Sequence, residues 1–199
     1  MNTPKPSALA QQFQLEINDA QEAMTSNAAQ IEKLVILHDQ LVECFRNGHK
    51  AMICGNGGSA SDALHISGEY LNRERVKVRR ALPLIALTGD VATITGIGND
   101  FGFDQIYARQ VDALGRKGDM LILLTTSGRS ANILAAQEIA KKSEVYTVSF
   151  SGGGPISEAA DLPFIIPSTS TERIQEATMN LLHMVTAAVE ATMEAELQA

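Results

Sequence analysis

Four side chains able to bind a metal ion or move protons occur in two pairs along this sequence of 199 residues. His65 and Glu69 are four positions apart, which places an imidazole and a carboxylate on one helix face. Such a pair can bind a metal ion or transfer protons, although it is also typical of an ordinary surface ion pair. Gln175 and His183 are eight positions apart, about 12 Å of rise and about 80° of rotation along a helix. They should therefore act at opposite ends of a ligand or come from different subunits.

His183 also has a plainer interpretation, because it interrupts the apolar run 181–185. A lone histidine on such a face is more often a packed core residue than a ligand.

Two turns rich in glycine and hydroxyl residues each separate an apolar run from a helical pattern. The first is CGNGGSAS at residues 54–61, and the second is TTSGRSAN at residues 125–132. Small residues let backbone N–H groups approach an anion, hydroxyls donate further hydrogen bonds, and a helix N-terminus adds a favourable dipole. Either turn alone could simply cap a helix. Two such turns after strands of one sheet indicate a phosphorylated ligand.

Nucleotide-binding signatures fit less well. The Walker spacing with its Gly-Lys-Ser/Thr is absent, which argues against an NTPase. Gly55, Gly57 and Ala60 match G-x-G-x-x-G/A, but position 75 is Arg where that signature has an acidic residue. A dinucleotide-binding protein is therefore a weak alternative.

Further polar residues could reach the same site. The segment 73–80 contains five basic residues, a composition typical of a solvated loop. Because it follows His65 and Glu69 directly, it could instead steer anionic substrates, and Arg73 is its best-placed member. Asn99 and Asp100 follow the second expected strand and could also face the pocket.

The elements that must position these residues follow from the hydrophobic pattern. Residues 7–47 contain no Gly or Pro and predict two amphipathic helices that stop at Asn47-Gly48. Strands are expected at 51–54, 84–87, 120–124, 145–150 and 164–166. Helices are expected at 59–71, 105–114, 130–142 and 172–196. Apolar strands alternating with helices predict an α/β domain whose parallel sheet is covered on both faces, with helical additions at both ends.

Composition excludes several classes of protein. The chain is 45% hydrophobic and 20% charged, with a net charge of −7, which indicates a folded domain and argues against electrostatic binding to nucleic acid. Its apolar runs are far shorter than the ~20 residues of a membrane helix. The start, MNTPKPSALA, does not have the pattern of a secretory signal, and Cys44 and Cys54 form no disulfide scaffold. We expect a cytoplasmic protein without a nucleic-acid or membrane partner.

The sequence resembles the SIS (sugar isomerase) family over about residues 31–193, and within it the members that isomerise phosphoheptoses. The matching segments are CGNGGSASDALHISGEYLNR (54–73), GIGNDFGFDQIYARQV (96–111), GDMLILLTTSGRSANI (118–133) and RIQEATMNLLH (173–183). The resemblance implies a single SIS α/β domain at 49–199, with a five-stranded parallel sheet flanked by helices and a long C-terminal helix. A helical segment at 1–48 would pack on the domain and on neighbouring subunits of a homotetramer, with active sites at subunit contacts.

The resemblance also implies an activity. It is the conversion of sedoheptulose 7-phosphate to D-glycero-D-manno-heptose 7-phosphate through an enediol, the first step of ADP-heptose and lipopolysaccharide core biosynthesis. One zinc ion per subunit would be bound by His65, Glu69, Gln175 and His183, with Glu69 as base and His183 as acid. The expected substrate contacts are Asn56, Gly57, Gly58, Glu69, Arg73, Asn99, Asp100, Thr125, Thr126, Ser127, Ser130 and Gln175.

Three positions depart from the family pattern: Gly68 where a second acidic residue is common, Thr125 where Ser is commoner, and Glu172 where Asp is frequent. The first two could alter the rate or the fit of the substrate. Two other functions stay open. One is a non-catalytic SIS tetramer that binds the replication initiator protein, although such relatives tend to lose the four metal-site residues present here. The other is isomerisation of a different sugar phosphate, such as an amino-sugar or pentose phosphate.

Overall fold

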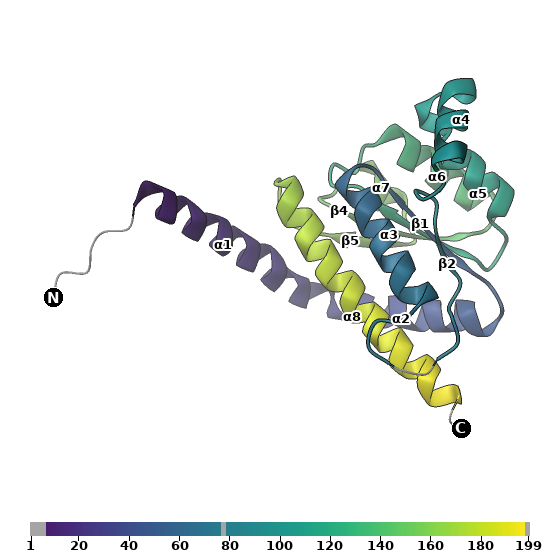
Figure 1. The fold of residues 1–199 in the computed structure, drawn as a ribbon, viewed down its shortest axis with the longest axis horizontal. Helices are drawn as coiled ribbons and strands as arrows, with labels where there is room; N and C mark the ends of the chain where they lie inside the picture. Colours follow the sequence, from purple (N-terminus) through teal and green to yellow (C-terminus); the bar gives the residue numbers. More distant parts are fainter. Residues whose placement is uncertain (1–6, 77–78, 198–199) are drawn as a thin grey trace.

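The computed structural model describes residues 7–76 and 79–197, and it contains a five-stranded parallel sheet between layers of helices (Figure 1). The strands are β1 (Ala51–Gly55), β2 (Leu84–Ala86), β3 (Met120–Leu124), β4 (Tyr146–Ser151) and β5 (Leu162–Ile165). Their order in the sheet is β2-β1-β3-β4-β5. The expectation of a parallel sheet is confirmed. Lys77 of the predicted basic segment and residues 1–6 of the predicted N-terminal segment lie outside the described residues.

One strand begins earlier than its pattern predicts. β5 starts at Leu162, whereas the apolar run suggested residues 164–166. The sequence pattern did not include the start of this strand because Pro163 is there and proline usually indicates a turn. It is tolerated here because β5 is an edge strand, which leaves one side of its backbone without a sheet partner.

The helices follow the expected alternation with two additions. They are α1 (Ala8–Ser26), the 3-10 turn η1 (Asn27–Gln30), α2 (Ile31–Arg46), α3 (Gly58–Leu71), α4 (Val91–Phe101), η2 (Phe103–Gln105), α5 (Ala108–Leu114), α6 (Ala131–Lys142), α7 (Pro155–Ala159) and α8 (Thr171–Leu197). The hydrophobic pattern did not predict α4 or α7. Gly96 and Gly98 weaken the helical signal of α4, and α7 is only five residues long.

Two hydrophobic cores cover the two faces of the sheet. Alternate residues of β1 belong to different cores: Ala51 and Ile53 pack with α2, α3 and α8, whereas Met52 and Cys54 pack with α5, α6 and α7. All five residues of β1 and of β3 are buried, as expected for strands covered on both sides. Each fully buried apolar side chain contributes about 1.5–3 kcal/mol, so this two-sided burial fixes the sheet between its helices.

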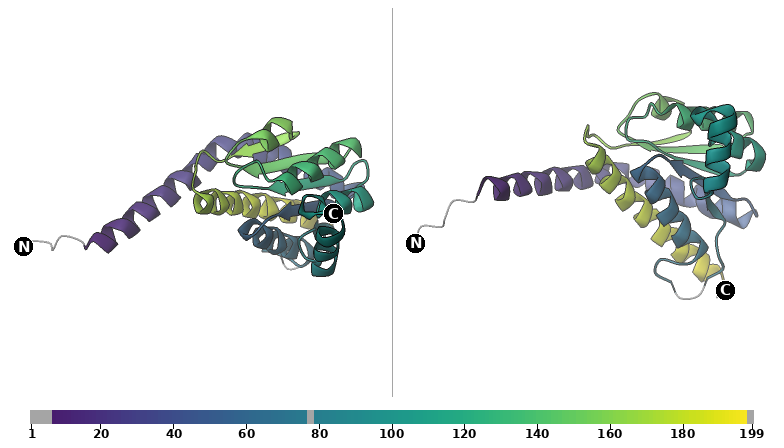
Figure 2. Two further views of the ribbon diagram at one scale, coloured as in Figure 1. Left: turned by 90° about the horizontal axis from the view of Figure 1, so that it is seen from above. Right: turned by 45° about the horizontal axis from the view of Figure 1, so that its top comes forward.

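The first helix extends away from the sheet (Figure 2). Ala23 is its one buried residue, whereas Phe13, Leu15 and Ile17 are exposed. Among the described residues, the structure has no helix long and apolar enough to cross a membrane.

The chain leaves β1 and β3 in opposite directions. After β1 it passes through α3 to β2, toward one edge of the sheet. After β3 it passes through α6 to β4, toward the opposite edge. The carboxyl ends of β1 and β3 therefore form a topological switch point, the place where open α/β sheets bind ligands.

Candidate active site

The two turns predicted to bind a phosphorylated ligand meet at this switch point. Asn56 in the first turn and Asn132 at the end of the second form a reciprocal amide pair, with N···O distances of 2.9 and 2.8 Å. Asn132 is buried and holds the predicted contact residue Asn56 in one orientation. Sequence reasoning missed Asn132, although it stands in the same motif as the hydroxyl residues of the second turn.

Close packing requires the small residues of the first turn. A Cβ atom on Gly55 would lie 2.6 Å from the carbonyl oxygen of Ser59, and one on Gly58 would lie 2.5 Å from Nε2 of Gln175. Gly57 has a φ of +55°, in the left-handed region that favours glycine. Tyr107 donates a hydrogen bond from its hydroxyl to the carbonyl oxygen of Gly55. The predicted contacts Gly57 and Gly58 are both exposed at the start of α3.

The second turn is held by its hydroxyl groups and by one glycine. Thr125 is buried, and its Oγ1 lies 3.2 Å from Oγ of Ser130. Ser127 is exposed, and its Oγ accepts a hydrogen bond from the backbone N–H of Arg129. Gly128 has a φ of +65°, and a Cβ atom there would lie 1.7 Å from the carbonyl oxygen of Gly153. The β4–α7 loop therefore presses directly against this turn.

A small pocket joins the second turn to α3 and α8. It is lined by Ser59, Asp62, Leu124, Thr125, Thr126, Phe150, Ile174, Gln175 and Thr178. Gln175 donates from Nε2 to Oγ of Ser59 at 3.3 Å, which brings the start of α8 to the start of α3. The structure thus gathers Thr125, Thr126 and Gln175 around one hollow.

Asp62 is a site residue that sequence reasoning missed. It lines the small pocket, and partial burial raises its pKa, an effect opposed by the nearby His65. The sequence feature that could have identified Asp62 is its position three residues before His65, which places both side chains on one face of α3.

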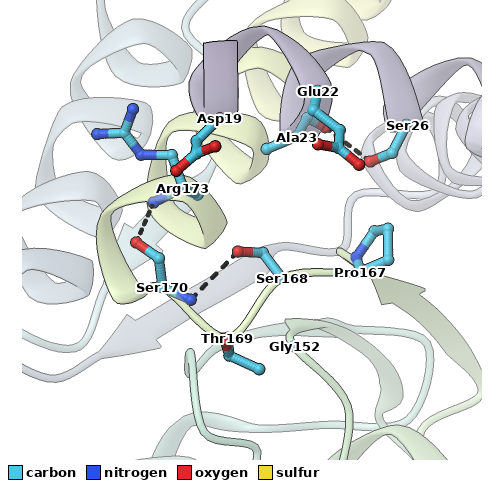
Figure 3. Close-up of a pocket in the computed structure, with 10 residues that line it drawn as sticks. All are labelled: Asp19, Glu22, Ala23, Ser26, Gly152, Pro167, Ser168, Thr169, Ser170 and Arg173. Carbon is cyan, nitrogen blue, oxygen red and sulfur yellow. Dashed lines mark hydrogen bonds between the residues drawn. The ribbon is translucent and has the colours of Figure 1, made fainter. Parts of the chain in front are cut away.

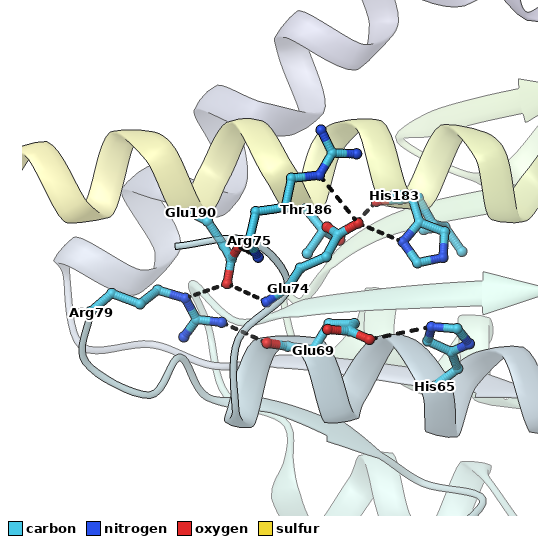
Figure 4. A network of polar contacts seen from close by, with 9 residues as sticks. His65, Glu69, Glu74, Arg75, Arg79, His183, Thr186 and Glu190 are labelled. Atoms are coloured by element: carbon cyan, nitrogen blue, oxygen red, sulfur yellow. Dashed lines mark hydrogen bonds and ion pairs between the residues drawn. The ribbon is translucent and has the colours of Figure 1, made fainter. Parts of the chain in front are cut away.

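The predicted acid–base residues also come together within one chain (Figure 4). Nε2 of His65 lies 3.3 Å from Oε1 of Glu69. The ring centroids of His65 and His183 are 5.0 Å apart, in an edge-to-face arrangement across the contact between α3 and α8. We call this contact the α3–α8 seam. Gln175 lies beside Ser59 at one level of the seam and His183 lies beside His65 at another.

A buried polar network closes the far end of the seam. Glu190 accepts hydrogen bonds from the backbone N–H groups of Glu74 and Arg75, each at 2.8 Å, and from Nε of Arg79 at 2.7 Å. Arg79 also donates to the carbonyl oxygens of Glu69 and Tyr70 at the end of α3. We call Glu190 and Arg79 the Glu190–Arg79 pair. Sequence reasoning missed this network; its signal was an acidic residue placed directly after the apolar Ala188 and Val189 of α8.

Opposing effects act on the ionisation of Glu190. Burial by itself would raise the pKa of this carboxyl group. The hydrogen bonds from Arg75, Glu74 and Arg79, together with the charge of Arg79, outweigh that effect and lower the pKa. The predicted basic segment is therefore not uniformly solvated: the side chain of Arg79 is 1% exposed and that of Glu190 is fully buried, whereas Arg73 is exposed.

The donor set of the seam fits the chemistry of zinc. Two imidazoles and a carboxylate, from His65, His183 and Glu69, are nitrogen and oxygen ligands that Zn²⁺ prefers. Nδ1 of His183 lies 2.8 Å from Oε1 of Glu74, which leaves Nε2 available, as in carboxylate–histidine–metal arrangements. Among the described residues, no three His, Cys, Asp or Glu side chains are yet close enough together to hold a metal ion.

The structure does not bring Asn99 and Asp100 to the seam. Both are exposed near the end of α4, where Nδ2 of Asn99 donates to Oδ1 of Asp100 at 2.7 Å. Asp100 lines a different pocket, together with Phe101 and Arg109. Within one chain, these two predicted contacts therefore form a separate group.

A larger pocket lies between α1 and the loop before α8 (Figure 3). Its polar groups mainly stabilise the start of α8: Oγ of Ser170 accepts from the backbone N–H of Arg173, and Oγ of Ser168 accepts from that of Ser170. Asp19 and Glu22 also line it, and their carboxylates disfavour a sugar phosphate. The hydroxyl and backbone N–H groups of the second turn, at the start of α6, are therefore better placed to bind an anion.

Neither cysteine is suited to nucleophilic chemistry. Both are buried, and burial raises the pKa of the Cys44 thiol to about 12 and that of Cys54 further. A thiol held protonated is a poor nucleophile, so neither cysteine is a candidate for a nucleophile at this site.

Comparisons with known proteins agree with this geometry. The SIS domain family matches residues 12–152. The phosphoheptose isomerase of Roseiflexus sp. is 45% identical over 166 residues, which cover 82% of this chain and 84% of the relative. Among solved structures, a phosphoheptose isomerase from Francisella tularensis aligns with a TM-score of 0.86 at 35% identity, covering 92% of this chain and 98% of the other. The phosphoheptose isomerase of Neisseria gonorrhoeae aligns with a TM-score of 0.81 at 34% identity, covering 92% and 97%.

Proposed function

We propose that this chain, which belongs to the SIS domain family and is an isomerase like its phosphoheptose isomerase relatives, converts sedoheptulose 7-phosphate to D-glycero-D-manno-heptose 7-phosphate. One observation carries the proposal. His65, Glu69 and His183 lie along the α3–α8 seam, and residues of the same two helices line a pocket together with hydroxyl groups of the second turn.

In the proposed reaction, Glu69 removes a proton from the carbon next to the substrate carbonyl, and His183 protonates the oxygen, through an enediol. Oε1 of Glu69 is 3.3 Å from Nε2 of His65. The Glu69 side chain is one-quarter exposed, so substrate can reach its carboxylate. A carboxylate and an imidazole are the groups that most often perform this proton transfer.

The far end of the substrate needs its own binding site. The turn from Thr125 to Ser130 would bind the phosphate through its hydroxyl and backbone N–H groups at the start of α6. Asn56, fixed by Asn132, and Gln175 would bind sugar hydroxyls. Fixing both ends of the sugar reduces the entropy lost on reaching the transition state.

We further propose one zinc ion per subunit, bound by His65, Glu69, Gln175 and His183. When bound, such an ion supplies a Lewis acid that polarises a carbonyl or organises the site. Coordination of Glu69 would make it a weaker base, so metal binding and proton abstraction compete for the same carboxylate.

The position of Asn99 and Asp100 supports a multimeric site. These exposed residues lie away from the seam in their own chain, so a neighbouring subunit would have to bring them to it. We propose a homotetramer with active sites at subunit contacts, in the cytoplasm, acting in the first step of ADP-heptose and lipopolysaccharide core synthesis.

The decisive experiment follows purified protein with sedoheptulose 7-phosphate by NMR in deuterated buffer, with and without zinc. We expect new aldose signals and deuterium at the carbon next to the carbonyl. A folded protein without turnover in either condition would refute the proposed substrate. In that case, a panel of amino-sugar and pentose phosphates would test the other isomerases, and binding to the replication initiator protein would test the non-catalytic alternative.

A further inference from the structure

Glu74 is a residue of the seam that neither the predicted site nor the proposed reaction uses. It lies in the loop that follows α3, and its Oε1 is 2.8 Å from Nδ1 of His183 on α8. The carboxylate side chain is 12% exposed and that of His183 is 32% exposed, so this is no loose surface pair.

The contact defines the state of the imidazole. An ionised carboxylate only accepts hydrogen bonds, so Nδ1 of His183 must carry the hydrogen. In the neutral imidazole, the lone pair is then on Nε2. Glu74 therefore selects one of the two tautomers of His183 and fixes the rotation of its ring, which stands edge-to-face to His65.

Glu74 is itself held in place from its backbone. Its N–H and that of Arg75 each donate to the carboxylate of Glu190, at 2.8 Å. Arg79 pairs with the same carboxylate and binds the two carbonyl oxygens at the end of α3. The loop is thereby attached both to α8, through Glu190, and to α3, through Arg79 (Figure 4).

Stability alone does not explain so polar an arrangement. A buried ion pair is often no more stabilising than well-packed apolar residues of the same volume, because both charges lose their hydration. What this network supplies is a fixed position for one carboxylate. Glu74 is the only side chain of residues 74–76 with an ion-pair or hydrogen-bond contact to His183 in the structure.

We propose that Glu74 is a positioning residue for His183, and that the Glu190–Arg79 pair holds it there. The carboxylate keeps the hydrogen on Nδ1 and presents Nε2 of His183 to the substrate side of the seam. The role of the tautomer in catalysis rests on the isomerase function proposed above, whereas the tautomer itself can be measured without substrate.

The test compares Glu74→Ala with the conservative Glu74→Gln, whose amide oxygen still accepts a hydrogen bond from Nδ1. Long-range ¹H–¹⁵N spectra of the metal-free proteins report the tautomer of each histidine, and a His183→Asn variant assigns the signals of His183. We expect wild-type protein and Glu74→Gln to show the Nδ1–H form, and Glu74→Ala to lose it. Glu138→Ala, on the exposed face of α6, is the matched control and should keep the wild-type spectrum.

Kinetics provide the second measurement. We expect kcat of Glu74→Ala to fall about tenfold to a hundredfold with little change in KM, the usual cost of losing the partner that orients a histidine. Glu74→Gln should recover most of this loss, which a merely structural defect would not allow.

Two results would overturn the proposal. One is an unchanged His183 tautomer in Glu74→Ala, and the other is a changed tautomer with an unchanged kcat. Failure of the proposed function would look different: wild-type protein would not isomerise the substrate, yet the spectra of Glu74→Ala and wild type would still differ.

Discussion

Helices α3 and α4 both carry predicted site residues, but the chain holds them very differently. Five residues of α3 are buried, and Arg79 binds the carbonyl oxygens at its end. No residue of α4 is fully buried: Ile94 and Ile97 pack against the second core while only partly buried, Asp90 caps the start of the helix, and Arg109 stacks on Phe101. Both helices carry exposed polar residues. Only those of α3 have a fixed position relative to α8 within the chain.

The difference indicates how the site is completed. His65 and Glu69 stand on a helix positioned by the core of its own chain, so their geometry is set when that chain folds. Asn99 and Asp100 stand on a helix with an unpartnered outer face, so their geometry depends on what packs against it. The following variants test whether α3 and α4 differ in this way.

The largest effect is expected from Glu69→Gln on α3. Because this change removes the proposed base and keeps the shape of the side chain, kcat should fall about a thousandfold. Steady-state kinetics with sedoheptulose 7-phosphate measure the loss, and circular dichroism checks the fold. Glu138→Gln on α6 is the control with an exposed carboxyl group. Substantial remaining activity of Glu69→Gln would remove Glu69 from its proposed role.

Glu190→Ala tests how firmly α3 and α8 are joined. The variant leaves Arg79 buried without its partner, so the free energy of unfolding should fall by about 3 kcal/mol. Urea unfolding at neutral pH measures the change. A loss no larger than that of Glu138→Ala would show that the network contributes nothing to the stability of the seam.

The same residue predicts a pH dependence. The pKa of Glu190 is lowered in the folded protein, so its contribution to stability is present above its ordinary pKa of 4.5 and is lost as the pH falls through the folded value. Wild-type protein should therefore lose stability below about pH 4.5 more steeply than Glu190→Ala. Parallel curves for the two proteins would contradict the lowered pKa.

Asp100→Ala on α4 should reduce kcat/KM about tenfold, the cost of one hydrogen bond to a charged group, without affecting stability. The sharper test mixes this variant with Glu69→Gln by co-expression. If α4 completes the site of a neighbouring subunit, mixed oligomers contain intact sites and exceed the activity of both parents. A mixture no more active than its parents would place both residues in the site of one chain.

The smallest effect is expected at glycines. A Cβ atom on Gly96 of α4 meets nothing within 4 Å, so Gly96→Ala should stabilise the helix by about 0.5–1 kcal/mol. At Gly55, before α3, the same change meets the backbone of Ser59 at 2.6 Å and should destabilise by about 1–3 kcal/mol. Thermal unfolding compares the two. A destabilising Gly96→Ala would show that another subunit already occupies that face of α4.

Sequence predicted most of the elements because their signals are local. The apolar runs of β1 and β3 read as strands buried on both faces, and the Gly-free stretches read as helices. The two polar turns were placed correctly at strand ends for the same reason. Helix α4 was missed because its glycines and threonines give a weak local signal, although the tertiary structure still forms it.

The contacts within the site were less predictable. Local patterns draw attention to Asn132, Asp62 and Glu190 but do not identify the side chains that they contact, and Glu74 has no such pattern. The Glu74–His183 contact joins residues 109 positions apart, and Asn56–Asn132 joins residues 76 apart. No spacing rule reaches across such distances.

The sequence by itself determined which segments are helices and strands, which faces are apolar and which turns could bind an anion, since backbone propensity and hydrophobic periodicity act over a few residues. Only the tertiary structure decided that α8 lies against α3, that a basic loop buries Arg79 against Glu190, and that Glu74 faces His183. Those pairings depend on the order of the strands and on the packing of helices distant in sequence. That order is a property of the whole fold, because burial of both faces of the sheet must be satisfied at once.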